Sequence, residues 1–600
     1  MRLLTTVPFL EVILLAERYS VMEKKYSAEK NVLQLVALMK AHGVKKIIAS
    51  PGNTNITFVG SVMNDPYFQV YSCVDERSAA YMACGMAEES GEPVALSCTG
   101  ATAARNYPSG LTEAFYRKLP VLAITSSQPF GREGQLFPQY TDRTVQFKDI
   151  VTMSVQIPYP YSADDEWANN VKINNALLQL RRNGGSPVHI NIATNFSHDF
   201  SVSSLPDERV IRRYTLKDKL PELTAGKVCV FVGSHKKFTP ELEHAVDEFC
   251  DRYNAIVLCD QTSNYKGKFR ILGGLASGQM HYWPVCRSAD VVIHLGEITG
   301  SYYWFKNTKV WRVNSDGEVR DPFKLLSKVF EMEEQDFFDY YNGQKNPSSN
   351  TYYQECVDEE NSMRQELQEL PLSNAWMCQQ TAPKLPENSA LHLGILNSLR
   401  SWNLFDTPKS VYSYSNVGGF GIDGVLSSCV GASLANPNKL FFCVLGDLAT
   451  FYDMNVLGNR HIGNNLRIIV SNNGTGYEMH CPGSIGEEFG EDSDRYFAAG
   501  GHYGKQSRKL LKDYSEDLGF EYISAESKEE YLSHLDYFVS PETHDRPILL
   551  EVFVSEEDDD KAYKLTREIR QDATLKAKNL AKSVLGEKGF QELKKILKKG

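Results

Sequence analysis

Short apolar runs alternate with longer amphipathic stretches along most of the chain. Residues 31–43 repeat apolar positions at helical spacing, and short apolar runs with polar ends follow at 45–52 and 68–76. Two more such runs, 93–100 and 120–127, come after another helical stretch. Apolar runs separated by helices predict parallel strands joined by right-handed crossovers.

The same alternation returns twice further along the chain. One set begins near residue 227 and another spans about 390 to 554, separated by a linker-like stretch rich in Glu, Gln, Asn and Ser. We therefore expect an α/β protein with three doubly wound parallel-sheet domains. Their expected bounds are 26–205, 206–345 and 389–555, with 1–25 as an N-terminal extension, 346–388 as a linker and 556–600 as a charged helical tail.

Composition and charge exclude several classes of protein. Hydrophobic residues make up 42% and charged residues 23% of the 600 residues, which excludes dominant disorder, collagen and coiled coil. The net charge of -11 disfavours a nucleic-acid partner. None of the twelve cysteines forms a Cys-x-x-Cys pair, so zinc ribbons, iron–sulfur clusters and a disulfide framework are not expected. Free thiols indicate a reducing compartment, and we expect a cytoplasmic location.

The first twenty residues are apolar but interrupted. Glu11 breaks the apolar run, no clear cleavage site follows, and the run is too short to span a bilayer. We expect Met22 to be the working start rather than a signal peptide to be present. No other stretch approaches transmembrane length, so no membrane partner is expected.

The strongest local motif is Gly446-Asp447-Leu448, with Asn473 following 26 residues after Asp447. Asp447 and Asn473 each end a predicted strand, so neighbouring strands would bring both side chains to one crevice. A carboxylate, an amide oxygen and a backbone carbonyl suit a Mg²⁺ ion that shares phosphate oxygens. The helix expected after Asp447 adds backbone N–H groups for an anion.

This arrangement resembles the diphosphate–Mg²⁺ motif of thiamine-diphosphate (ThDP) enzymes. Glu76, at a predicted strand end before an Ala-rich helix, resembles the glutamate that hydrogen-bonds N1′ of the aminopyrimidine in that superfamily. A carboxyl held against this nitrogen favours the imino tautomer, which takes the proton from the thiazolium. The resemblance implies ThDP and Mg²⁺ as cofactors. It also makes the three domains pyrimidine-binding, central Rossmann-like and diphosphate-binding, in chain order.

A series of motifs narrows the resemblance to the menaquinone-pathway synthase branch, whose member joins a 2-oxoglutarate-derived unit to isochorismate. The series includes Ser50-Pro51-Gly52, Asp75-Glu76-Arg77 and Gly421-Ile422-Asp423-Gly424, in the same order, and covers most of residues 28–554. The resemblance implies Mg²⁺ ligands Asp447, Asn473 and the carbonyl of Thr475, catalytic groups Glu76 and Gln139, and cofactor-binding residues Gly52, Glu76, Asn416, Gly421, Ile422, Gly446, Asp447, Leu448, Ala449, Asn473 and Thr475.

Four arginines that bind substrate carboxylates in that branch are missing. Their positions hold Thr54, Gln128, Val417 and about Gly394. Each lost charge-assisted contact costs about 1.5–3 kcal/mol. We therefore expect ThDP-dependent decarboxylation of a different 2-oxo acid, with transfer of the acyl carbanion to an acceptor. The alternatives are the menaquinone-pathway synthase itself, a non-catalytic ThDP-fold binding subunit and a flavin-dependent acetolactate-like ligase.

Other polar residues are candidates for the substrate side of the site. Arg105 and Arg132 could restore a positive group. Glu478 and His480 follow the metal loop and could move protons, so both are candidate catalytic residues. The expected partners are a small-molecule 2-oxo acid and an acceptor. The resemblance also implies a homodimer or homotetramer, because the superfamily builds each active site from the first domain of one chain and the third of another.

Overall fold

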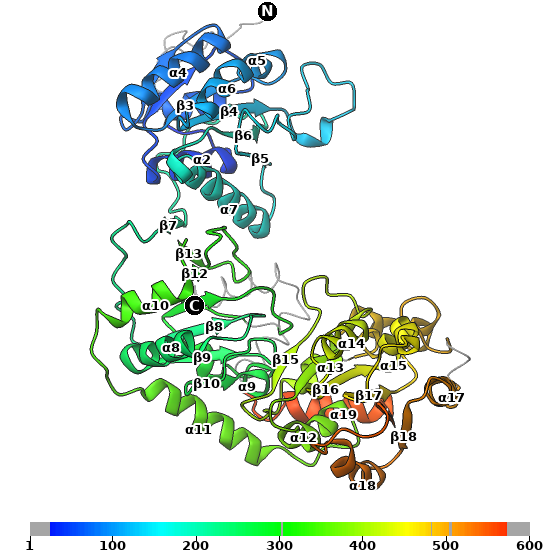
Figure 1. Ribbon diagram of the computed structural model, residues 1–600. Helices are drawn as coiled ribbons and strands as arrows, with labels where there is room; N and C mark the ends of the chain where they lie inside the picture. Colours follow the sequence, from blue (N-terminus) through cyan, green and yellow to red (C-terminus); the bar gives the residue numbers. More distant parts are fainter. Residues whose placement is uncertain (1–24, 302–303, 482, 503–506, 573–600) are drawn as a thin grey trace, which may run out of the picture. The chain divides into compact units, whose positions relative to one another are not determined.

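The computed structural model describes residues 25–301, 304–481, 483–502 and 507–572 (Figure 1). The expected extension before residue 25 and the tail beyond 572 lie outside the described residues. The chain divides into two compact units. The first takes the chain up to Tyr214 together with Glu318–Val329, and the second takes Thr215–Gly317 and the chain from Phe330 on. Within the described ranges, no helix is both long and apolar enough to cross a membrane.

The first unit is built on a six-stranded sheet in the order β2-β1-β3-β4-β6-β5, with every neighbouring pair parallel. The expected strands at 45–52, 68–76, 93–100 and 120–127 are all present. The strands are β1 Lys46–Ala49, β2 Gln69–Ser72, β3 Val94–Cys98, β4 Val121–Ser127, β5 Met153–Ile157 and β6 Val188–Ala193. The helices are α2 Lys30–Ala41, α3 Ile56–Val62, α4 Glu76–Ser90, α5 Thr102–Asn106, α6 Pro108–Tyr116 and α7 Ala163–Gln179.

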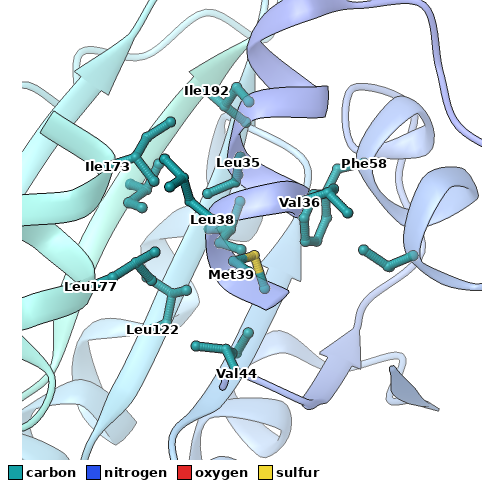
Figure 2. Close-up of a cluster of buried hydrophobic side chains, with 14 of the residues drawn as sticks. Leu35, Val36, Leu38, Met39, Val44, Phe58, Leu122, Ile173, Leu177 and Ile192 are labelled. Carbon is teal, nitrogen blue, oxygen red and sulfur yellow. The ribbon is translucent and has the colours of Figure 1, made fainter. Parts of the chain in front are cut away.

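Helices cover both faces of this sheet. On one face, α2 packs with α3 and α7 around buried Leu35, Leu38 and Met39 (Figure 2). On the other face, α4, α5 and α6 pack small residues such as Ala79, Ala80 and Ala83 against β3 and β4. Cores on both faces of a parallel sheet are what a doubly wound fold requires.

The second unit contains two further parallel sheets. In the central one, β10, β9, β8, β11 and β12 are neighbours in that order and all parallel. The elements of this part of the second unit are β8 Val228–Val232, α8 Pro240–Tyr253, β9 Ala255–Cys259, β10 Arg270–Leu272, α9 Gly274–Ser277, β11 Val291–Leu295, β12 Lys309–Val313, α10 Glu334–Asn342 and α11 Thr351–Glu366. Two more strands, β7 Arg212–Tyr214 and β13 Leu326–Phe330, come from segments assigned to the first unit, apart from the last residue of β13.

The third sheet repeats the order of the first. Its strands run β15-β14-β16-β17-β19-β18. If the strands of each sheet are numbered along the chain, both sheets have the order 2-1-3-4-6-5. The fold class is therefore confirmed: three parallel-sheet α/β domains. The elements are α12 Asn374–Thr381, β14 Ala390–Leu393, α13 Asn397–Trp402, β15 Tyr412–Tyr414, α14 Val425–Ala435, β16 Phe441–Gly446, α15 Asp447–Asp453, β17 Leu466–Asn472, α17 Leu510–Asp517, β18 Glu521–Ala525, α18 Lys528–Phe538, β19 Ile548–Phe553 and α19 Glu556–Arg567.

All twelve cysteines are free thiols, and eleven of them are buried. Cys443 lies on β16 and Cys98 on β3, inside apolar strands. Burial raises the pKa of the Cys98 thiol to about 12. Buried thiols of this kind act as small core residues rather than nucleophiles.

Candidate active site

Two neighbouring strands of the third sheet end at one corner. β16 and β17 pair in parallel, with Gly446 opposite Ser471. Asp447 begins α15 directly after β16, and Asn473 follows β17. The Asp447 Oδ2 atom accepts a hydrogen bond from the backbone N–H of Gly474 at 3.0 Å. The structure therefore brings the two motif residues together at the carboxyl edge of the sheet.

A cavity of about 600 Å³ lies at this corner. It is large enough for a drug-sized or cofactor-sized molecule. A Cβ added at Gly446 would meet only the Ser471 carbonyl, at 3.9 Å, so the entrance beside this strand end is open. Among the sequence-predicted residues, the cavity is lined by Ile422, Gly446, Asp447, Leu448, Ala449, Asn473, Thr475 and Glu478. Asn416, Gly421 and His480 do not line it.

The carboxyl of Asp447 is buried without a basic side chain beside it among the described residues. Burial raises its pKa to about 7, although the N–H groups of Leu448 and Gly474 act in the opposite direction. No basic side chain in the described part of the chain forms an ion pair with it. The hydroxyls of Ser471 and Thr475 are also buried without hydrogen-bond partners there. A divalent cation would favour the ionised carboxylate, so the residues present fit a Mg²⁺–diphosphate group.

Asn473 is held by a residue that the sequence did not single out. Its Nδ2 donates to Oδ2 of Asp559 at 3.3 Å, and the other oxygen of Asp559 accepts from the backbone N–H of Asn374 at 3.1 Å. Asp559 is buried, and burial raises its pKa to about 6. The predicted linker and the predicted tail thus both reach the site, through α12 and α19. Within the acidic run at 556–560, no pattern distinguishes the inward-facing member.

The two proton-transfer candidates after the metal loop are both engaged. Glu478 accepts two hydrogen bonds from Nη2 of Arg400, at 2.9 and 3.1 Å. His480 lies 2.9 Å from Asp494 through Nε2 and 3.5 Å from Glu556 through Nδ1. Glu478 lines the cavity and His480 lies behind it, held between two carboxylates.

The first unit carries the remaining predicted residues. Glu76 starts α4, and its Oε2 accepts from Nδ2 of Asn106 at 3.1 Å. A Cβ at Gly52 would come within 2.5 Å of Thr99, so only glycine fits where the loop after β1 meets the loop after β3. Gln139 is exposed on a long loop, with φ +60°.

The four positions that lack arginine are filled by other contacts. Thr54 donates to the Ser126 carbonyl at 2.9 Å, and Gln128 donates to the Pro138 carbonyl at 3.1 Å. Val417 is buried, and a Cβ at Gly394 would lie 3.3 Å from Leu445. None of these four side chains is charged, but Nη1 of Arg132 donates to the side-chain oxygen of Gln128 at 2.7 Å, so a guanidinium lies beside that position.

This chain is similar to a protein family, to curated proteins and to a solved structure. The family described as thiamine pyrophosphate enzyme, N-terminal TPP binding domain, matches residues 32–147. A 2-succinyl-5-enolpyruvyl-6-hydroxy-3-cyclohexene-1-carboxylate synthase from Bacteroides fragilis is 31% identical over 567 residues, which is 90% of this chain and 98% of the relative. The synthase of that name from Bacteroides thetaiotaomicron is 32% identical over 569 residues, with the same two shares. The solved structure of the Rhodococcus jostii RHA1 thiamine diphosphate-dependent 4-hydroxybenzoylformate decarboxylase covers 88% of this chain and 99% of its own, at 16% identity and a TM-score of 0.38.

These matches correct one expectation. The missing arginines led us to expect a substrate different from that of the menaquinone-pathway enzymes. This expectation is wrong, because the two relatives named above carry the same synthase name and each matches 90% of this chain. The physical reason is that a motif position is not the only source of charge. Arg132 contacts Gln128 through its 2.7 Å hydrogen bond, and Arg105 and Arg143 line a cavity in the first unit, whereas Arg400 is ion-paired with Glu478.

Proposed function

We propose, since this chain belongs to the 2-succinyl-5-enolpyruvyl-6-hydroxy-3-cyclohexene-1-carboxylate synthase family of ThDP enzymes, that it carries out the synthase reaction itself. The donor is 2-oxoglutarate, which loses CO₂, and the acceptor of the remaining four-carbon unit is isochorismate. The observation that carries the proposal is the identity of 31–32% spread over 90% of the chain.

The diphosphate end of the cofactor belongs to the cavity at Asp447. Asp447, Asn473 and the carbonyl of Thr475 would hold Mg²⁺, and Gly446, Leu448 and Ala449 would face the diphosphate. The burial of the Asp447 carboxyl, with no basic side chain of the described residues paired to it, supports this assignment, because an ion of charge +2 offsets the cost of burying the carboxylate. Asp559 would keep the amide of Asn473 turned so that its oxygen stays available.

When bound, ThDP supplies a nucleophilic carbon and an electron sink for decarboxylation. Glu76 would hold a proton at the ring nitrogen of the pyrimidine, and Asn106 orients the Glu76 carboxyl by its 3.1 Å hydrogen bond. Ile422 would support the bent cofactor from below, since its side chain lines the cavity and packs on the core of the third sheet. Gln139, Glu478 and His480 are the proposed polar groups on the substrate side.

We also propose that the working form contains two or four copies of the chain, as in the ThDP enzymes that it resembles. Light scattering at micromolar concentration tests this directly. A monomer that is fully active would contradict it.

A panel of 2-oxo acids tests the donor assignment. CO₂ release is measured with added ThDP, Mg²⁺ and isochorismate for 2-oxoglutarate, pyruvate, 2-oxobutyrate and benzoylformate. We expect 2-oxoglutarate to give the highest kcat/KM. Preference for a monocarboxylic 2-oxo acid would overturn the donor assignment.

A further inference from the structure

A second cavity lies entirely within the first unit and is strongly basic. Its volume is about 440 Å³, which suits a small organic molecule. It lies between α5–α6 and the sheet, under the loop at 143–147. Its lining residues are Ala104, Arg105, Tyr107, Pro108, Leu111, Ala123, Thr125, Arg143, Val145, Gln146, Phe147 and His189. Two guanidinium groups line it and no carboxylate does.

Arg143 is the main charged group of this cavity, and it is only 3% exposed. Its Nε and Nη2 donate to Oδ1 of Asn191 at 3.3 and 3.2 Å, and its Nη1 donates to the Thr141 hydroxyl at 2.9 Å. Both partner residues are neutral, and no ion pair to Arg143 occurs among the described residues. Because a guanidinium has five N–H donors, one N–H on each terminal nitrogen remains for a ligand.

No carboxylate in the described part of the chain contacts this guanidinium, although Asp142 attracts it from a distance. Asp142 is next to Arg143 in the chain, but its carboxylate accepts from the backbone N–H and the hydroxyl of Thr144. Arg105 donates only to the Asp142 backbone carbonyl, at 2.9 Å. Burial, with a contribution from Arg105, lowers the pKa of Arg143, although the nearby Asp142 carboxylate acts in the opposite direction. Buried charges in proteins are normally paired, and Arg143 is the buried member here, since Arg105 is exposed.

Neutral polar groups complete the cavity wall. The Tyr107 hydroxyl is buried and has no oxygen or nitrogen partner in the described chain. His189 is hydrogen-bonded to Thr125 and Ser154, each at 2.8 Å. Burial and the neighbouring Arg143 lower the pKa of His189 to about 3. His189 therefore stays neutral and adds no positive charge to the cavity wall. The Tyr107 hydroxyl is next to the Cys98 thiol, so the unused guanidinium N–H groups are the charged donors of the cavity, and they favour an acceptor-rich anion.

We propose that this cavity is a binding site for a small organic carboxylate, held by Arg143 from the wall and Arg105 at the rim. The planar fork of a guanidinium matches the two oxygens of a carboxylate, and the apolar side chains of Ala104, Leu111 and Phe147 match a short carbon skeleton. The site stands on the cavity's own residues and does not depend on the proposed synthase reaction. The ligand is either the donor acid of that reaction or a separate organic acid.

Isothermal titration calorimetry on the full chain without ThDP tests the site, because binding is then measured apart from turnover. The probes are 2-oxoglutarate, succinate and benzoate, with inorganic phosphate and chloride as competitors. We expect at least one carboxylate to bind, and Arg143→Gln to weaken it by at least about tenfold, with Arg143→Lys between the two. Binding that survives Arg143→Gln unchanged, no binding of any carboxylate, or equal binding of phosphate would overturn the proposal.

A second variant guards against a folding defect in Arg143→Gln. Val145 lines the cavity and its side chain is 82% exposed, so substitution there leaves the core intact. Val145→Glu places a competing carboxylate at the rim and should weaken the probe at least about tenfold, whereas Val145→Gln should not. Equal affinities for these two variants would contradict the site.

Steady-state kinetics then separates the two sources of ligand. If the cavity holds the donor acid, Val145→Glu raises the KM for 2-oxoglutarate relative to Val145→Gln. If it holds a separate acid, the KM is equal in the two variants while the calorimetric affinities differ. Both results are consistent with the carboxylate site. A protein that binds the probe but has no synthase activity would contradict the synthase proposal and leave the carboxylate site standing.

Discussion

Asp447 and Gly474 are joined by a 3.0 Å hydrogen bond from the Gly474 backbone N–H to the Asp447 carboxylate, across two parallel strand ends. This contact fixes the loop after β17 against the start of α15. It also explains how residues far apart in the chain form one wall of the cavity. Backbone N–H groups hold this buried carboxylate and no basic side chain of the described residues pairs with it, so the proposed Mg²⁺ would balance its charge.

Asp447→Asn tests this arrangement by removing the charge while keeping the shape. We expect Mg²⁺-dependent binding of ThDP to weaken by roughly tenfold or more, because the amide is a poorer ligand for a hard cation. Equilibrium dialysis with and without Mg²⁺ measures it. Asp492→Asn, at an exposed surface carboxylate, is the matched control and should bind as the wild type does. Unchanged Mg²⁺ dependence in Asp447→Asn would remove Asp447 from the ligand set.

Asp559→Ala tests the indirect support of Asn473. The change removes the acceptor for both the Asn473 side chain and the Asn374 backbone N–H. Loss of such a supporting contact costs about 10–100-fold in metal affinity, so Mg²⁺-dependent ThDP binding should fall within that range. Glu557→Ala, on the exposed side of the same helix, is the control. Equal binding by the two variants would show that Asp559 has only a packing role.

The Arg400–Glu478 pair should behave as one unit. Both side chains are largely buried, and removing one partner leaves the other charge unpaired. We expect the double variant to lose less stability than the sum of the losses in the single variants Arg400→Met and Glu478→Gln. A coupling free energy of about 1–3 kcal/mol from urea unfolding is the expected result. Additive single effects would mean that the pair contributes no coupling.

Glu360, on α11, gives the protein a pH-dependent stability of known sign. It accepts from the Ala276 backbone N–H at 3.2 Å, and burial raises its pKa from 4.5 to about 7. Between pH 4.5 and about 7, the folded state therefore holds a proton on Glu360 that the unfolded chain has released. The contribution of Glu360 to stability is complete below pH 4.5 and is lost as the pH rises through about 7.

Glu360→Gln should remove that loss, because glutamine keeps the acceptor without the charge. Relative to wild type, the variant should gain roughly 1–3 kcal/mol of stability between pH 5 and pH 8. Urea midpoints at the two pH values measure the effect, with Glu557→Gln as an exposed control. A parallel pH dependence in Glu360→Gln and wild type would contradict the assignment to Glu360.

The sequence was sufficient for the fold and for one side of the site. Apolar runs located the strands, and strand ends placed Asp447 and Asn473 together, because parallel strands deliver their carboxyl ends to one edge. Asp559 and Asn374 could not be found in this way. They reach Asn473 through tertiary packing of α19 and α12, and neither lies at a strand end.

Charge replacement was only partly visible in the sequence, which offered Arg105 and Arg132 but not Arg143. Thr54, Gln128 and Val417 showed where arginines were missing, but a motif comparison does not show which other cations enter a cavity. Arg143 becomes conspicuous only when its burial and its neutral partners are known. The mistaken expectation of a different substrate arose from counting positions rather than charges in space.

The most direct test of the central claim is a single incubation with ThDP, Mg²⁺, 2-oxoglutarate and isochorismate, followed by mass spectrometry of the products. We predict CO₂ release coupled one-to-one to the joined 2-succinyl product, and loss of both in Glu76→Gln, whose amide cannot hold the proton at the pyrimidine nitrogen. Isochorismate left unconsumed by wild-type protein that binds ThDP, or a joined product formed equally by Glu76→Gln, would contradict the account.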